Sequence, residues 1–225
     1  MIQIKQRVEE FKIDLIKGRL TYEEIFQKHI VDGNTFFFQS HLGNIAQEYQ
    51  TKSLIANFLG VSIHEIIFVG SAKLGYSLNP KNLFNEFDSK FNVTKINKDK
   101  SDLDIAIVSN SLFNNITKNI FDYTDAFKNK WDQNEYYFGD KLNDFKVPIC
   151  YKYFEYFSKG WFRPDMKPQG YEFCVKNTFE ELKRNLFANF KRKSGIGIYQ
   201  DWHFFKHYHI NNLKSLSYRV KTETL

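Results

Sequence analysis

Apolar residues recur at steps of three and four along the first sixty positions of the chain. The first run predicts a helix over 2–17 whose buried face carries Ile4, Val8, Phe11 and Leu15. A second helix is predicted over 21–30, because Thr21 and Glu24 have the spacing of a capping box. The chain therefore begins with amphipathic helices.

A third helix is predicted over 44–59, where Gly60 ends it. Its inward face is expected to carry Ile45, Tyr49, Ile55 and Phe58. Short runs rich in β-branched and aromatic residues then predict buried strands at 64–69 and at "LDIAIV", 103–108. The segment between the strands, 79–100, is rich in Asn and Lys and has little periodicity, which favours an inserted loop or an extended excursion.

Helical patterns also occur after the second predicted strand and near the C-terminus. A helix that begins at Ser111 is expected to bury Phe113, Ile116, Ile120 and Phe127. The segment 136–168 mixes short strand-like and aromatic pieces, and its pattern assigns no element. After it, the sequence predicts a helix over 177–193, a strand over 194–200 and a final helix over 201–216, capped by its first residue.

No internal repeat and no linker interrupts these patterns. We therefore expect a single α/β (α+β) domain over 1–225, with a small mixed sheet and added N-terminal and C-terminal helices. It would comprise a helical prelude at 1–60, a motif-bearing core at 61–131, and the remaining core with the C-terminal helices at 132–225.

Composition excludes several classes of protein. Apolar residues make up 42% of the 225 positions and aromatic residues 18%, which is too hydrophobic for a disordered chain. No apolar stretch is long enough to span a bilayer, and Cys150 and Cys174 show no C-x-x-C spacing. The first residues are charged throughout, unlike a signal peptide. We expect a soluble cytoplasmic protein with reduced thiols, and the net charge of +6 favours polyanionic partners.

Two carboxylates stand at the start of the second strand, in "SDLDIAIV". Asp102 and Asp104 are two residues apart, so both side chains point to the same face of the strand. Like charges at this spacing repel, and burial of either without a partner is costly. Mg²⁺, which prefers oxygen ligands, or Mn²⁺ would offset the repulsion, although a pair of exposed acids is the simpler alternative.

The first strand ends in "FVGSAKLG", where Gly70 and Ser71 begin a helix-like stretch. Alone, this pattern favours an ordinary tight turn with an N-cap. Followed by the carboxylate pair, it suits a nucleoside triphosphate, because Gly70 allows close backbone approach and Ser71 can donate a hydrogen bond. Lys73 would be able to reach a γ-phosphate, and a solvated surface lysine is the alternative interpretation.

At these residues the sequence resembles the DNA polymerase β-like nucleotidyltransferase superfamily. Its signature is a hydrophobic strand ending in Gly-Ser, a helix, and Asp-x-Asp on the next strand. Gly70, Ser71, Asp102 and Asp104 occupy the motif positions, and the resemblance covers roughly 68–108. It implies a small mixed sheet, Mg²⁺ or Mn²⁺ on Asp102 and Asp104, and a nucleoside triphosphate as substrate.

The sequence departs from this family in two ways. The family separates the two halves of the motif by about a dozen residues, so the longer spacing here is consistent with an insertion at 79–100. The family also places a third carboxylate on a later strand. The best candidates are Asp201, which follows "SGIGIYQ", and Asp165 in "WFRPDMKP". If neither reaches the metals, the site would bind nucleotide without transferring it.

The resemblance implies transfer of a nucleotidyl group to a hydroxyl of RNA, of another nucleotide or of a protein. The "KRK" run at 191–193 and Arg163 beside Trp161 are candidate contacts for a polyanionic acceptor, or else a solvated helix end and a structural loop. The N-terminal helices look similar to those of bacterial cyclic-oligonucleotide synthases, and the small size suits toxin-type transferases. By analogy, a role in antiviral defence or a toxin–antitoxin system is expected. The alternative is a catalytically degenerate member that binds nucleotide or RNA as a sensor or partner subunit.

Overall fold

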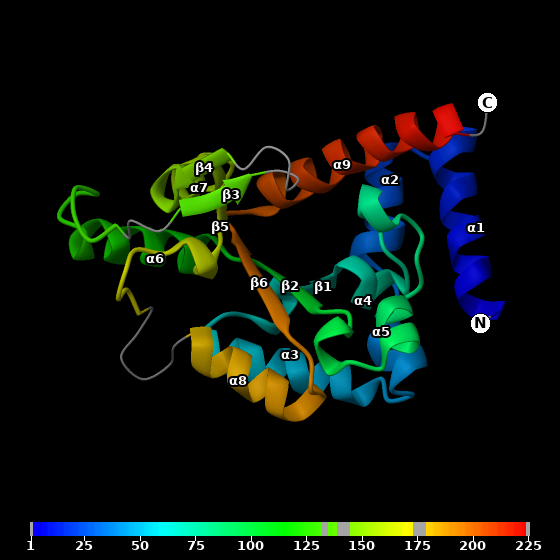
Figure 1. Ribbon diagram of the computed structural model, residues 1–225, viewed down its shortest axis with the longest axis horizontal. Coiled ribbons are helices and arrows are strands. Elements are labelled where there is room, and N and C mark those ends of the chain that lie inside the picture. The colour runs from blue at the N-terminus through cyan, green and yellow to red at the C-terminus, as the bar shows by residue number, and fades with distance from the viewer. Residues whose placement is uncertain (1, 132–134, 139–144, 173–178, 224–225) are drawn as a thin grey trace.

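The computed structural model describes residues 2–131, 135–138, 145–172 and 179–223. At its centre lies a mixed sheet of four strands in the order β1-β2-β6-β5 (Figure 1). These strands are β1 (Ile66–Val69), β2 (Leu103–Val108), β5 (Trp161–Phe162) and β6 (Ser194–Tyr199). β2 runs antiparallel to β1 and parallel to β6, while β5 is antiparallel to β6. The predicted α/β class and small mixed sheet are therefore confirmed.

Helices surround the sheet, and a separate hairpin lies beside it. The α-helices are α1 (Ile2–Lys17), α2 (Tyr22–Ile25), α3 (Ala46–Leu59), α4 (Gly70–Leu74), α5 (Ser89–Thr94), α6 (Asn110–Tyr123), α7 (Ile149–Phe157), α8 (Phe179–Phe190) and α9 (Trp202–Glu223). The π- and 3₁₀-helical turns are η1 (Phe26–Val31), η2 (Phe37–His41), η3 (Ile63–Glu65), η4 (Pro80–Asn82), η5 (Asn97–Asp99) and η6 (Pro164–Met166). The hairpin pairs β3 (Glu135–Phe138) with β4 (Phe145–Pro148).

Side chains of the central strands alternate between two hydrophobic cores. Ile105 and Ile107 of β2 join the core beneath the sheet, which includes residues of α3, α6 and α8. Ala106 and Val108 face the other core, which is built with α1, α2 and α9. In Figure 1 the helices α3 and α8 lie on one side of the sheet and α9 on the other. Because the period of a strand is two, Asp104 shares the face of Ala106 and so lies on the α9 side.

Most predicted elements are present near their expected bounds. The capping box of Thr21 and Glu24 forms, although the helix that it begins continues as the π-helix η1. Gly60 ends α3 in the left-handed conformation, with φ at +68°. The expected inward positions Ile45 and Tyr49 are wrong, because these side chains are 52% and 67% exposed.

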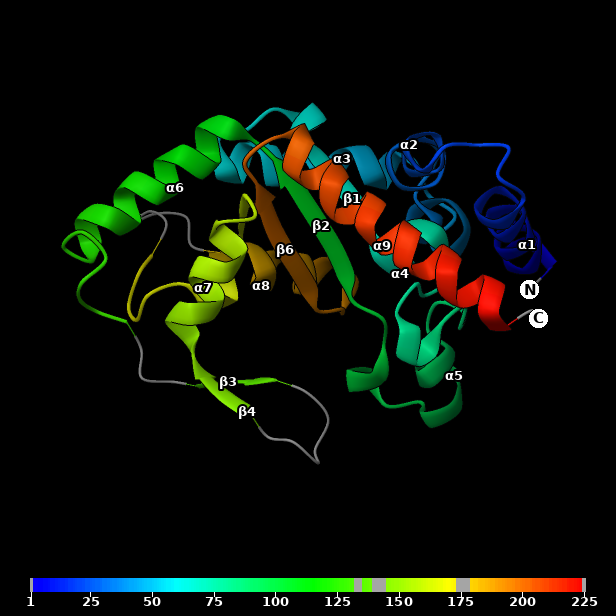
Figure 2. The same cartoon turned by 90° about the horizontal axis from the view of Figure 1, so that it is seen from above.

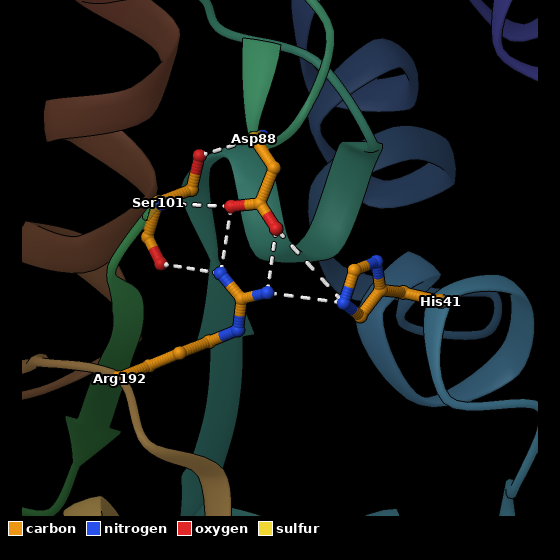
Figure 3. Close-up of polar contacts among 4 residues, drawn as sticks. All are labelled: His41, Asp88, Ser101 and Arg192. Atoms are coloured by element: carbon orange, nitrogen blue, oxygen red, sulfur yellow. Dashed lines mark hydrogen bonds and ion pairs between the residues drawn. The ribbon is translucent and has the colours of Figure 1, made fainter. Parts of the chain in front are cut away.

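The segment after the first strand is an ordered insertion rather than a structureless loop. It contains η4, α5 and η5, and Asp88 at its centre is buried. Arg192, which lies between α8 and β6, donates to Asp88 Oδ1 and Oδ2 over 2.7 and 2.5 Å (Figure 3). Ser101 closes the loop, since its backbone N–H donates to Asp88 Oδ1 over 2.8 Å. This ion pair attaches the insertion to the edge of the sheet.

His41, at the end of η2, is partly exposed and lies beside the buried Asp88–Arg192 pair. Burial and the Arg192 charge lower the pKa of His41, so the neutral ring accepts a hydrogen bond of 3.0 Å from Arg192. The Arg192 guanidinium also lies against the rings of Phe37 and Phe87, at 5.3 and 4.9 Å from their centroids. The four segments of the chain that meet here are therefore mutually fixed.

Two further sequence expectations concern cysteines and membranes. Cys150 is a free thiol, and Cys174 lies outside the described residues. None of the helices in the described part of the chain combines the length and the apolar character that crossing a bilayer requires.

Removal of one partner of the buried pair should destabilise the fold strongly. We expect Arg192→Met to lower the free energy of unfolding by about 3–5 kcal/mol, because it leaves the buried Asp88 carboxylate uncompensated. The measurement is urea denaturation followed by fluorescence. The double variant Asp88→Asn with Arg192→Met should recover part of the loss, and Lys191→Met, an exposed neighbour, should change little. Equal losses for Lys191→Met and Arg192→Met would contradict this role.

Candidate functional site

Asp102 and Asp104 lie where β2 begins, at the edge of the sheet that faces the insertion. Asp104 is level with Val69 of β1 and with Gly195 of β6, so its neighbours are the ends of two other strands. Asp104 is partly buried and Asp102 is exposed. No residue in the described ranges donates a hydrogen bond to either carboxylate or forms an ion pair with one. The predicted pair is thus brought together on one face, as the spacing required.

Two glycines leave the space that the Asp104 carboxylate occupies. A Cβ atom on Gly70 would lie 2.7 Å from Asp104 Oδ2, and one on Gly195 would lie 2.6 Å from Oδ1. Gly70 also has φ at +66°, a conformation that L-residues rarely adopt. A glycine therefore ends β1 because any side chain there would collide with Asp104 and would strain the backbone.

The surroundings of both carboxylates disfavour negative charge. Burial and the neighbouring Asp102 charge raise the pKa of Asp104 to about 6, while the Arg163 charge acts in the opposite direction. Burial raises the pKa of Asp102 as well, against the opposing charges of Lys193 and Arg192. A bound divalent cation would reverse these shifts by stabilising both carboxylates. The chemistry of the pair therefore fits a hard cation.

Both aspartates open into a groove of about 1220 Å³. Gly70 and Ser71 line it beside the aspartates, so the structure brings both halves of the sequence motif to one cavity. One wall of the groove comes from α9 and the other from the insertion, whose helix α5 lies toward the C-terminal half of α9 in Figure 2. Arg219 of α9 also donates a hydrogen bond to the backbone oxygen of Pro80 in η4. The first-turn N–H groups of a helix lack intrahelical acceptors, so those of α4 remain able to donate to a ligand.

Lys73 borders this groove, but its side chain is buried and hydrogen-bonded to the backbone. Its Nζ donates to the backbone oxygens of Gly33 over 2.6 Å and Val31 over 3.2 Å. Burial lowers the pKa of Lys73 to about 8, and the side chain is held by these acceptors because a buried ammonium needs them. The Lys73 ammonium was expected to reach a γ-phosphate, but it donates its hydrogen bonds to backbone oxygens at and after the end of η1.

The two candidates for a third carboxylate lie apart from the pair. Asp201 caps α9, where its Oδ1 accepts from the backbone N–H of His203 over 2.8 Å. It follows Tyr199, which is already about 13 Å beyond Gly195 along β6. Asp165 is paired with Arg163 across 2.7 Å and is half exposed. Neither Asp201 nor Asp165 lines the groove, and among the described residues neither forms a metal-binding group with the pair.

The strand beside β2 has glycines on the face of the aspartates. Gly195 lies level with Asp104, and a Cβ on Gly197 would collide with Trp161 Nε1 at 2.5 Å. Among the described residues, no group of three or more His, Cys, Asp or Glu side chains is arranged so that it could hold a metal ion. The protein itself thus supplies two carboxylates here.

Sequence reasoning missed Gly195 and the two groove lysines of the insertion, whereas Lys193 belongs to the "KRK" run that was a candidate contact for a polyanion. Lys98 and Lys100 belong to the insertion, and Lys193 precedes β6; all three line the cavity with the aspartates. A signal for the glycine was available, since two glycines at alternate positions of an apolar strand indicate close approach by another group. Lys98 and Lys100 had no comparable signal, because their position beside the aspartates depends on how the insertion folds back.

The glycine slot can be tested by a double-mutant cycle. We expect Gly195→Ala to destabilise the protein by about 1–3 kcal/mol, because the new methyl group displaces the Asp104 carboxylate. In the Asp104→Ala background the same change should cost much less, since the colliding oxygens are gone. Chemical denaturation of the four proteins measures both costs. Equal costs in the two backgrounds would show that Gly195 does not accommodate Asp104.

Comparison with known proteins identifies no relative of this chain. Neither a family model, nor a curated protein, nor a solved structure matches the chain, so its family is not identified by similarity.

Proposed function

We propose that the protein is a nucleotidyltransferase, which binds a nucleoside triphosphate together with Mg²⁺ or Mn²⁺ in this groove. One observation carries the proposal: Gly70 and Ser71 line the same cavity as Asp102 and Asp104. Neither carboxylate forms an ion pair with a described residue. The polymerase β-like type of sheet remains part of this proposal. It rests on the motif and on the antiparallel–parallel arrangement of β1, β2 and β6.

The two carboxylates fit the needs of a magnesium ion. Mg²⁺ is commonly bound through one or two carboxylates together with substrate phosphates and water, rather than by a complete cage of protein ligands. Asp102 and Asp104 would hold the ion, and when bound it would neutralise charge on the phosphates and on the leaving group. The slot between Gly70 and Gly195 fixes the direction of Asp104 toward the groove.

The other residues of the site would bind and orient the nucleotide. Gly70 leaves room for a phosphate to approach the backbone, and the N–H groups at the start of α4, with the Ser71 hydroxyl, would donate to its oxygens. In the transfer, the acceptor oxygen forms a bond to the α-phosphorus and the bond to pyrophosphate breaks. The hydroxyl proton is released to solvent, so atoms and charge balance.

A second candidate is a binder that holds the nucleotide without transferring it, as a sensor or partner subunit. It is favoured by the start of β6 and the residue before it, where the positions beside Asp102 and Asp104 carry Lys193 and Gly195 in place of a third carboxylate. Both candidates share the metal and the triphosphate. A place in stress response, phage defence or a toxin–antitoxin system stays a prediction from the family resemblance.

Binding of the triphosphate should depend on the divalent cation and on the aspartates. We expect calorimetry to detect ATP or another nucleoside triphosphate with Mg²⁺ or Mn²⁺, and to detect none after EDTA. Asp102→Asn with Asp104→Asn should abolish this binding and keep the fold, because removal of the repelling charges does not destabilise the apo protein. Asp165→Asn, an exposed carboxylate outside the groove, is the matched control.

An α-labelled triphosphate then separates the two candidates. Label transferred to RNA, to a nucleotide or to protein by the wild type, and lost in the double variant, supports the transferase. Metal-dependent binding with no transferred label supports the binder. Equal triphosphate affinity with and without EDTA would contradict the metal site in both.

A further inference from the structure

The groove is larger than one small ligand requires. Pockets for single small molecules usually measure about 300–1,000 Å³, whereas this groove measures about 1220 Å³. Its lining follows α9 from Tyr208 to Thr222, a length of about 21 Å at the rise of an α-helix. Gly70 and Ser71 occupy only one part of it, so the cavity has room for a second ligand.

Three lysines of the groove lack an ion-pair partner among the described residues, and of these Lys193 lies close enough to Asp102 to lower its pKa. Lys98, Lys100 and Lys193 line the cavity, and none of them forms an ion pair with a residue in the described ranges. Three other cations of the groove are engaged. Lys73 donates to the backbone oxygens of Val31 and Gly33, Lys90 pairs with Asp99 over 2.6 Å, and Arg219 donates to the backbone oxygen of Pro80. Lysines without a carboxylate partner at a cavity wall are suited to bind an anion.

The buried ion pair fixes the positions of two of these lysines. Lys100 directly precedes Ser101 and Lys193 directly follows Arg192, and both of these neighbours belong to the cluster in Figure 3. The backbone N–H of Leu103 donates to the oxygen of Lys193 over 2.9 Å, which places Lys193 beside Asp102. The backbone that carries Lys100 and Lys193 is therefore held in place before a ligand binds, which lowers the entropic cost of binding.

Aromatic rings line the opposite wall. Tyr208 and Tyr218 of α9 are 39% and 75% exposed, and both border the groove. Unpaired bases stack on such rings, and a groove that combines them with lysines is typical of proteins that bind single strands. A neutral small molecule would not need the lysines, and a lone phosphate would not need the rings.

We propose that this groove binds a single-stranded nucleic acid, with its phosphates on Lys98, Lys100 and Lys193 and its bases on the α9 tyrosines. The inference rests on the proposed function in one respect, because it makes this strand the acceptor whose hydroxyl lies next to Asp102. Binding of the strand itself does not require the metal. Gly70 and Ser71 would remain the place of the triphosphate.

The test uses fluorescence anisotropy with a labelled single-stranded RNA, the matching DNA strand and the RNA duplex. We expect wild type to bind both single strands more tightly than the duplex, with affinity that falls steeply with salt. The variant Lys98→Ala, Lys100→Ala, Lys193→Ala should bind more weakly, and the slope of log K against log salt should shrink by about 2, for three lost phosphate contacts. RNA preferred over DNA, or the reverse, identifies which strand is the ligand.

Two control variants remove equal numbers of lysines and tyrosines from surfaces outside the groove. Lys5, Lys118 and Lys128 are exposed, lie outside the groove and form no ion pairs among the described residues, so their triple alanine variant matches the net charge. Tyr218→Ala should weaken binding at least about fivefold, whereas Tyr49→Ala, on the outer face of α3, should not. Thermal melts confirm that each variant is folded.

The outcomes separate this inference from the proposed function. Equal losses in the two lysine variants would reduce the effect to net charge and overturn the inference, as would the absence of single-strand binding by the wild type. Loss of triphosphate binding in the groove variant would assign the lysines to the nucleotide and overturn it too. Lysine-dependent strand binding without any triphosphate binding would support the inference and contradict the proposed function.

Discussion

The buried ion pair between Asp88 and Arg192 connects parts of the chain that are far apart in sequence. It joins the insertion to the strand that lies next to Asp104, and His41 adds the N-terminal helical region. A buried pair of this kind contributes little net stability compared with apolar packing, but loss of one partner is costly. Its effect here is on geometry, because it fixes the position of the insertion, which forms one wall of the groove, relative to Asp102.

A second constraint acts at the scale of single atoms. Asp104 occupies a slot that exists only because Gly70 and Gly195 lack side chains. The slot directs a carboxylate with a raised pKa into the groove, next to the start of α4. The same strand β6 that provides this space carries no acidic residue beside the pair, so a bound nucleotide and water would have to supply the remaining ligands of a cation.

The sequence predicted the parts of this structure that depend on local patterns. β2 and α1 appear at their expected bounds, because a short apolar run and a helical periodicity each report burial directly. The outward position of Tyr49 was missed, since α3 turns a different face to the core than its apolar residues suggested. The two aspartates were found from spacing alone. The Asp88–Arg192 pair was not found, because long-range contacts leave no periodic signal in the chain.

The central claim is that Asp102 and Asp104 together bind a divalent cation that contacts a nucleoside triphosphate. The most direct measurement is a crystal structure with Mn²⁺ and a non-hydrolysable triphosphate analogue, in which manganese is located by its anomalous scattering. The account predicts a manganese peak bonded to oxygens of both carboxylates and of the phosphates, with the phosphates beside Gly70. A bound analogue with no manganese at the aspartates, or with manganese held elsewhere, would contradict it.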